Sequence, residues 1–144
     1  MIYVGSDHVG FDLKTEICNF LNFNKYKFKD LGCFDKNKTD YPKIAQILTK
    51  KIKLKIDNGI LICGTGVGMS IVANRHPNIR AVVCSETYSA TMAKKHNDSN
   101  VLCLGARVIG SENAFLIIHE WLNSSFEGGR HLKRIKMFNS SKIY

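Results

Sequence analysis

The stretch ILICGTGVGMS, residues 60–70, places a cysteine between a run of apolar residues and three glycines at alternate positions. The apolar run is typical of a strand buried on both faces, and the glycines are typical of a tight loop. Glycines after a strand let backbone N–H groups come close to an anion. A thiol directly ahead of them is not part of a nucleotide-binding pattern, so the stretch predicts an anion site with a chemistry of its own.

Short apolar runs alternate with amphipathic stretches along the rest of the chain. The runs rich in Ile, Val and Leu, which predict buried strands, are 2–5, 59–63, 79–84 and 100–104. Residues 26–32 predict a fifth, more exposed strand, and the apolar spacing predicts helices over 11–22, 87–97 and 111–125. This alternation predicts the α/β class: a three-layer α/β/α sandwich around a five-stranded, mostly parallel, Rossmann-like sheet.

The segment 40–62 fits two different structures. Alternating residues before the Asp-Asn-Gly sequence at 57–59 are typical of a hairpin. A proline at position 42 and apolar residues three and four apart indicate instead a helix that begins near Asp40. The apolar residues that this helix would turn inward are Ile44, Ile47, Leu48 and Ile52. The proline and the spacing favour the helix.

The length and the charge limit the kinds of protein that this chain can be. Its 144 residues suit a single domain, 1–144, which ends in a basic helical C-terminal tail from about residue 128. The formal net charge is +9, but the lysines are spread out, and KKIKLKI at 50–56 alternates charged with apolar residues. No aromatic residues for base stacking are interleaved with that run, so we expect a solvated face and no nucleic-acid partner.

The five cysteines are an odd, scattered set with no CxxC pair and no Cys/His ligand spacing. Free thiols in a reducing compartment are therefore the expected state. The N-terminal residues resemble neither a signal peptide nor a membrane span, so we expect a cytoplasmic protein without a membrane partner. Because the sequence lacks HxxxH, HExxH and a carboxylate cluster, we also expect no metal site.

Polar residues follow several of the predicted strands. Ligands bind at the carboxyl ends of the strands in an open parallel sheet, so these residues are expected at one edge. The residues in question are Asp7 and His8, Cys63 to Gly68, Ser85 and Glu86, and Gly105 to Arg107. His96, Asn97 and Asp98 end a helix just before the fifth strand, and we expect them to face the same edge.

The glycine loop has one competing interpretation, a dinucleotide-binding fingerprint. Glu86 lies 22 residues after Gly64, near the place of a ribose-binding acid. The pattern would however need glycine at position 69, where Met69 stands, and it normally follows the first strand of a domain. Here the loop follows the third strand, so this interpretation is the less favoured one.

The helix predicted after the loop gives Cys63 a possible chemical role. Residues 66–70 would present unpaired N–H groups and the positive end of a helix dipole to the thiol, which favours the thiolate. A base beside an oxyanion cradle is what proton abstraction alpha to a carbonyl requires. Arg130 and Arg134 lie four apart, so on a helix they would share one face and could bind a phosphate. A structural cysteine and a solvated basic tail are the alternatives.

Six motifs together resemble the type B ribose-5-phosphate isomerases. They are SDHVGF at 6–11, TDYP at 39–42, GILICGTGVGMSIVANR at 59–75, IRAVVCSETYSA at 79–90, HNDSNVLCLGARVIG at 96–110 and EGGRHLKR at 127–134. Galactose-6-phosphate and allose-6-phosphate isomerases share this framework. The resemblance implies an α/β/α sandwich that interconverts ribose 5-phosphate and ribulose 5-phosphate, in the pentose phosphate pathway, without a metal or an organic cofactor.

The resemblance also implies a role for each site residue. Cys63 matches the general base that forms an enediolate, because VGMS offers no acid in its place; Thr65 assists proton transfer, and His96 promotes ring opening. Asp7 and Tyr41 would contact the sugar, and one histidine and three arginines, His8, Arg107, Arg130 and Arg134, would surround the phosphate. The implied substrate-binding residues are Asp7, His8, Tyr41, Gly64, Gly66, Val67, Gly68, Ser70, Asn97, Arg107, Arg130 and Arg134.

The family forms homodimers or dimers of dimers in which two chains build each site, and the resemblance implies the same assembly here. A sugar phosphate is the expected small-molecule partner. Two alternatives stay open. One is an isomerase for a six-carbon sugar phosphate, and the other is a non-catalytic domain that binds a sugar phosphate or a nucleotide in the same glycine loop.

Overall fold

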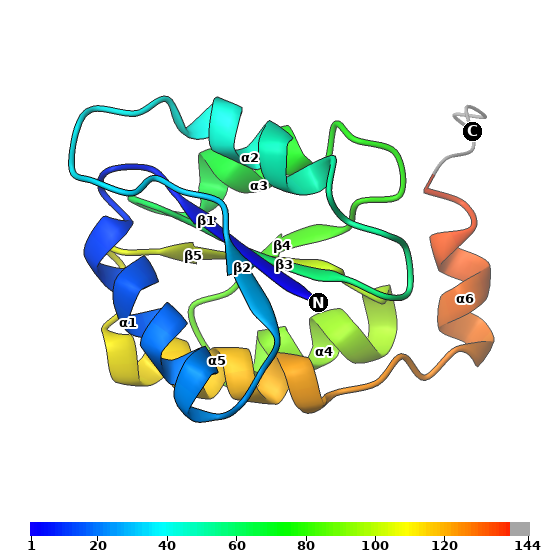
Figure 1. Ribbon diagram of the computed structural model, residues 1–144. Helices are drawn as coiled ribbons and strands as arrows, with labels where there is room; N and C mark the ends of the chain where they lie inside the picture. Colours follow the sequence, from blue (N-terminus) through cyan, green and yellow to red (C-terminus); the bar gives the residue numbers. More distant parts are fainter. Residues whose placement is uncertain (139–144) are drawn as a thin grey trace.

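A computed structural model describes residues 1–138 and shows one five-stranded sheet (Figure 1). The strands are β1 (Ile2–Ser6), β2 (Phe28–Asp30), β3 (Asn58–Cys63), β4 (Ala81–Val83) and β5 (Val101–Gly105). They lie in the order β2-β1-β3-β5-β4, and every neighbouring pair is parallel. The predicted sheet is confirmed, with all of its pairings parallel.

The helices cover both faces of the sheet. They are α1 (Phe11–Phe23), α2 (Tyr41–Thr49), α3 (Val67–Ala73), α4 (Thr87–Asn97), α5 (Ser111–Asn123) and α6 (Gly129–Ile135). Parallel crossovers are right-handed, so the direction of each step along the sheet decides which face its helix covers. The connections from β2 to β3 and from β3 to β4 run in one direction across the sheet, so α2 and α3 cover the same face. The connections from β1 to β2 and from β4 to β5 run in the opposite direction, so α1 and α4 cover the other face together with α5 (Figure 1). The three-layer α/β/α sandwich is thus confirmed.

The alternation of side chains along the strands divides the core into two layers. In β3, Ile60 and Ile62 face α1 and α5, whereas Leu61 and Cys63 face α2 and α3. All four side chains are buried, as expected for a strand covered by helices on both faces. The thiol of Cys63 therefore lies on the face of the sheet that α2 and α3 cover.

In the ambiguous segment 40–62, a helix is followed by a loop and then by β3, and the hairpin is wrong because β3 pairs only in parallel, with β1 and β5. Ile44 and Leu48 on α2 are buried, as predicted. Ile47 is 46% exposed, so its predicted inward direction is wrong. A helix of 9 residues covers the sheet with one narrow stripe, and Ala45 completes that stripe in place of Ile47.

The C-terminal tail begins with α6, which packs against α4 outside the layers (Figure 1). Arg130 and Arg134 are both exposed on this helix, as the predicted helical tail requires. The predicted tail continues into residues 139–144, which lie outside the described part of the chain. Between residues 1 and 138 no helix combines the length and apolar character that a bilayer crossing needs.

Candidate active site

The carboxyl ends of β1 and β3 form the point where the strand order reverses. The chain leaves β1 toward β2 on one side and leaves β3 toward β4 on the other. Crossover helices diverge at such a point and leave a crevice in which open α/β sheets bind ligands. Asp7 and His8 follow β1 at this crevice, and the glycine loop follows β3, so the strand order brings both motifs to one place.

Cys63 lies under the first turn of α3. Its side chain is buried, and its Sγ accepts a hydrogen bond from the Gly66 N–H, with N and S 3.2 Å apart. Gly66 has a φ of +78°, and a Cβ there would stand 3.1 Å from the Leu104 carbonyl carbon, so both conformation and space require glycine. This turn directs a backbone donor at the sulfur, as a thiolate requires.

The first N–H groups of α3 have different partners. Val67 N–H donates to the Thr65 hydroxyl oxygen at 3.3 Å. The next two groups, on Gly68 and Met69, have no hydrogen-bond acceptor among the described residues, as is usual in the first turn of a helix. Two donors therefore remain for a ligand. Both lie within residues 66–70, for which the sequence predicts unpaired N–H groups, although Met69 is missing from the substrate-binding residues that the resemblance implies.

The start of the loop after β5 holds Arg107 beside the glycine loop. The backbone N–H groups of Ala106 and Arg107 donate to the carbonyl oxygens of Cys63 and Gly64, at 2.8 and 3.0 Å. A Cβ at Gly64 would lie 3.8 Å from Cδ of Arg107. The guanidinium thus belongs to the same edge as Cys63, as predicted.

Asp7 and His8 are held by backbone donors. One Asp7 oxygen, Oδ1, accepts the N–H groups of Val9 and Gly10, each at 3.0 Å. The other, Oδ2, has no protein partner among residues 1–138. Nδ1 of His8 accepts the Thr39 N–H at 3.2 Å, so in the neutral ring Nε2 carries the proton and acts as a donor.

Tyr41 packs directly on the glycine loop. A Cβ at Gly68 would lie 2.7 Å from Cζ of Tyr41, so the absence of a side chain at Gly68 makes room for the ring. Ser70 is also in this region, but its side chain is buried and its hydroxyl donates to the Val67 carbonyl at 2.8 Å. The Ser70 proton is therefore engaged within the helix.

His96 and Asn97 lie at the other edge of the sheet, and the expectation that they face the Cys63 edge is wrong within one chain. A helix that leads into a parallel strand ends where that strand begins, which is the amino edge. Lys94 Nζ, one turn earlier, donates to Asn58 Oδ1 at the start of β3, at 2.5 Å. Five residues of strand separate Asn58 from Cys63, about 17 Å at the usual rise.

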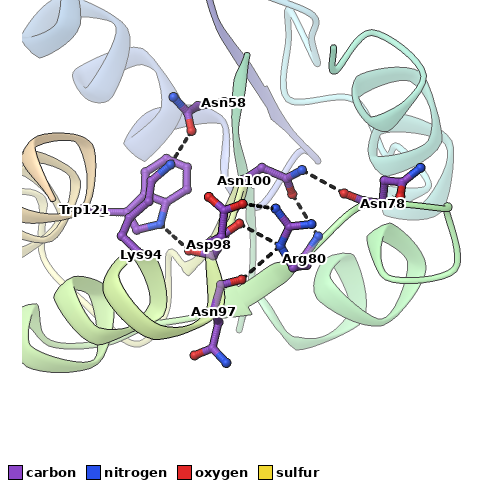
Figure 2. Close-up of polar contacts among 9 residues, drawn as sticks. Asn58, Asn78, Arg80, Lys94, Asn97, Asp98, Asn100 and Trp121 are labelled. Carbon is purple, nitrogen blue, oxygen red and sulfur yellow. Dashed lines mark hydrogen bonds and ion pairs between the residues drawn. The ribbon is translucent and has the colours of Figure 1, made fainter. Parts of the chain in front are cut away.

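The end of α4 is fixed by side chains (Figure 2). The Arg80 guanidinium donates to the carbonyl oxygens of Asn97 and Asp98 at 2.9 and 2.8 Å, and to the Asp98 carboxylate at 2.7 Å. Lys94 lies 4.1 Å from the ring centroid of Trp121, and burial lowers the Lys94 pKa to about 8. The helix end that carries His96 is thus rigidly attached to the sheet.

The arginines of the tail lie with His96. The Glu127 N–H donates to the Lys95 carbonyl at 3.0 Å, and the His131 ring stacks on the His96 ring with centroids 4.1 Å apart. Burial lowers the pKa of His131, as do His96 and the two arginines, whereas Glu127 opposes them. Arg130 and Arg134 flank His131 on α6. Within one chain, Arg130 and Arg134 therefore lie apart from His8 and Arg107, the other residues that the resemblance implies around the phosphate.

The predicted site residues therefore form two groups at opposite edges. Those at the carboxyl edge are Asp7, His8, Tyr41, Cys63, Gly64, Thr65, Gly66, Val67, Gly68, Ser70 and Arg107. Those at the amino edge are His96, Asn97, Arg130 and Arg134. The sequence analysis expected His96 and Asn97 at the carboxyl edge, because it followed the strands and not the path of α4.

The remaining polar candidates have structural roles. The Glu86 carboxylate caps α4 by accepting the Ser89 N–H at 2.9 Å, and this bond lowers its pKa. Burial raises the pKa of Cys18 and of Cys84 to about 11, and it raises the pKa of Cys103 further. These three thiols stay protonated at neutral pH and pack as small apolar side chains.

The sequence matches the family described as Ribose/Galactose Isomerase over residues 2–138. Ribose-5-phosphate isomerase B of Escherichia coli (strain K12) is 49% identical to it over 136 residues, which cover 94% of this chain and 91% of that protein. The structure of ribose-5-phosphate isomerase B from Clostridium thermocellum has a TM-score of 0.91 and 44% identity, and the match covers 94% of this chain and 92% of that one.

A ligand-bound structure is also similar to this chain. Ribose-5-phosphate isomerase B from Mycoplasma genitalium, solved with bound ribulose-5-phosphate, has a TM-score of 0.86 and 36% identity, covering 94% of this chain and 91% of that one. The family match spans almost every described residue, and the relatives cover most of the chain. The resemblance of the six motifs is thereby confirmed: the chain is an isomerase and belongs to the ribose/galactose isomerase family.

Proposed function

We propose that the chain interconverts ribose 5-phosphate and ribulose 5-phosphate, with Cys63 as the general base. The observation that carries this proposal is the Cys63 sulfur, 3.2 Å from the Gly66 nitrogen at the start of a helix whose Gly68 and Met69 N–H groups have no partner in residues 1–138. A thiolate beside such donors combines a base with an oxyanion cradle. The relatives named for ribose 5-phosphate isomerisation support the choice of substrate.

The proton transfers follow from this placement. The Cys63 thiolate takes the proton from C2 of the open-chain aldose, and the electron pair of that C–H bond forms the C1–C2 double bond as charge moves to O1. The N–H groups of Gly68 and Met69 stabilise the charged oxygen. The Thr65 hydroxyl relays the O2 proton to O1, and the Cys63 thiol returns its proton to C1. The product is the ketose, with no net gain or loss of protons.

A second copy of the chain completes the site in this proposal. His96 is the proposed ring-opening residue and Arg130 and Arg134 are proposed phosphate ligands, yet all three lie at the edge of the sheet opposite to Cys63. Each site would therefore take its base from one chain, and its ring-opening histidine and arginines from the partner. In a symmetric dimer both sites are then equivalent.

Exposed apolar side chains near the glycine loop support such an assembly. Val67 and Ile71 lie four apart on α3 and are 49% and 54% exposed. Val83 and Tyr88, in and after β4, are 41% and 72% exposed. Grouped apolar side chains beside a functional loop are typical of a surface that another chain covers. We propose that the partner copy covers this surface.

A coupled assay tests the proposed function. The same preparation is assayed on ribose 5-phosphate, allose 6-phosphate and galactose 6-phosphate, and kcat/KM is compared. The proposal expects the highest value on ribose 5-phosphate. A higher value on a six-carbon sugar would reassign the substrate, and saturable binding without turnover of any of the three would make the chain a sugar-phosphate-binding domain.

A further inference from the structure

Helices α1 and α5 lie side by side on one face of the sheet, and two hollows follow the line between them (Figure 1). One hollow, of about 320 Å³, is lined by Glu16, Asn19, Phe20, Phe23 and Phe115. The other, of about 280 Å³, lies where both helices begin, and Glu16 lines it as well. The two hollows therefore adjoin at Glu16, and we call them together the α1–α5 groove.

The α1–α5 groove has an aromatic floor and an apolar rim. The rings of Phe20 and Phe115 stack with their centroids 4.8 Å apart. Phe23, three residues after Phe20, is 85% exposed, the largest exposed fraction of any large apolar side chain in residues 1–138. Leu116 on α5 is 60% exposed. Grouped exposed apolar side chains of this kind are typical of a surface that another molecule covers.

The exposed charges on these two helices are all negative. Every Asp and Glu that lies in a helix of residues 1–138 belongs to α1 or α5, and all of them are exposed: Asp12, Glu16, Glu112 and Glu120. Lys14 on α1 is buried and pairs with Asp30, so it presents no charge to the solvent. The α1–α5 groove is thus bordered by acidic groups in a chain whose net charge is +9.

Two of these carboxylates are free to bind a cation. The Glu16 and Glu112 side chains have no hydrogen bond or ion pair with any other residue in the range 1–138. Asp12 pairs with Lys36 at 2.9 Å, but both side chains are exposed, and such a pair contributes little to stability. A partner's cation can therefore approach the groove without breaking a buried contact.

The charge and the shape together select the class of partner. The acidic border repels nucleic acid and acidic lipid. In a two-fold pairing of this face with a second copy, acidic groups would lie against the same acidic groups, which is unfavourable. An amphipathic helix with lysine or arginine beside its apolar stripe matches both the aromatic floor and the acidic border. At about 1.5 Å per residue, the 13 residues of α1 offer such a helix about 20 Å.

We propose that the α1–α5 groove is the docking site for a basic amphipathic helix of a partner protein. Apolar side chains of that helix pack between Phe23 and Phe115, and its cations pair with Glu16 and Glu112. The groove lies on the face of the sheet opposite to α3, whose exposed side chains we assigned to a second copy of the chain. Both partners can therefore bind at once.

Fluorescence anisotropy with a labelled leucine–lysine peptide tests the docking site. The peptide is as long as α1 and has its leucines on one helical face. We expect saturable binding with one peptide per chain, in the micromolar range, that weakens as the salt concentration rises. A second peptide with glutamate in place of each lysine should not bind, because the acidic border repels it.

Variants of the full chain locate the binding. Phe23→Ser removes the exposed anchor and Glu16→Lys reverses a charge, so each should weaken binding by at least about tenfold. Both side chains are exposed, so neither change threatens folding. Ile56→Ser is the matched control, because Ile56 is an exposed apolar residue in the lysine-rich loop at 50–57 and should leave the affinity unchanged.

Three results would overturn the proposal: no saturable binding of the leucine–lysine peptide, equal binding of the glutamate peptide, or unchanged affinity in both Phe23→Ser and Glu16→Lys. Sedimentation velocity of the chain alone adds a fourth. If Phe23→Ser lowered the oligomeric state, a second copy would cover the groove in place of a basic helix. The docking site does not depend on the proposed function, since a chain that bound the peptide but turned over no sugar phosphate would lose the proposed function alone.

Discussion

The two edges of the sheet hold their polar residues by different means. At the carboxyl edge, Cys63, Asp7 and His8 each accept hydrogen bonds from backbone N–H groups. At the amino edge, side chains such as Arg80 and Lys94 hold the end of α4. The carboxyl edge thus supplies backbone donors for a developing negative charge. The amino edge holds His96 and its neighbours in fixed positions. Neither edge holds all the groups that the proposed reaction requires.

The largest expected effect is at the carboxyl edge. Cys63→Ala removes the proposed base, so kcat should fall by about 10² to 10⁴, while the affinity for ribose 5-phosphate changes little. Steady-state kinetics and calorimetry measure the two quantities. Cys18→Ala, which replaces a protonated thiol on α1, is the control and should keep kcat. A near-normal kcat in Cys63→Ala would remove Cys63 from the mechanism.

Mixed assemblies test whether the two edges cooperate between chains. Homodimers of Cys63→Ala and of His96→Ala should both be nearly inactive. When the two are unfolded and refolded together, about half of the dimers are mixed, and each mixed dimer has one site with both groups intact. Activity should therefore return to about a quarter of wild type. Mass spectrometry confirms mixing, and activity no higher than in separately refolded samples would contradict the shared site.

The arginines at the amino edge should affect binding more than chemistry. Arg130→Ala or Arg134→Ala removes a charge-assisted donor to the phosphate, so KM should rise about tenfold with little change in kcat. Lys133→Ala is the matched control, because Lys133 is an exposed cation on the same helix. If KM were the same in wild type and in both arginine variants, α6 would be a solvated basic helix.

The smallest expected effect concerns the pH dependence of stability. The folded-state pKa of Lys94, about 8, lies below its ordinary value of 10.5, so between these values the unfolded chain binds more protons. The contribution of Lys94 to the free energy of unfolding therefore rises as the pH rises through this range. Lys94→Met should flatten that rise by an amount on the order of 1 kcal/mol.

Urea unfolding at pH values on either side of 9 measures this difference. Lys95→Met is the control, because the Lys95 side chain is 40% exposed and should leave the slope unchanged. Equal slopes in wild type and Lys94→Met would show that the side chains at the amino edge are no more sensitive to pH than the backbone contacts at the other edge.

Local patterns were sufficient to predict most of the fold and one of the two groups of site residues. Continuous apolar runs predict buried parallel strands, and the glycines after Cys63 predict the turn that Gly66 adopts at positive φ. Most of the carboxyl-edge residues follow because they come directly after a strand, whereas Tyr41, at the start of α2, is implied by the resemblance alone. These features depend on residues that are close together in the sequence, so one sequence is enough to predict them.

The placement of His96 depends on more distant relationships. It requires the knowledge that α4 returns to the start of β5, and that order of strands is decided by packing across the whole sheet. The stacking of His131 on His96 joins segments that no short motif connects. Ile47 was misplaced for a similar reason, because the width of the buried stripe on α2 depends on the surface that it covers.

The alternation of side chains along β3 limits how this gene can vary in length. Ile62 faces one layer of helices and Cys63 the other, so the loss or gain of one codon within 58–63 would turn the thiol toward α1 and α5. The loop at 50–57 has no such restriction, since most of its residues are exposed. Insertions and deletions inherited among relatives should therefore accumulate before Asn58, and β3 should keep a constant length.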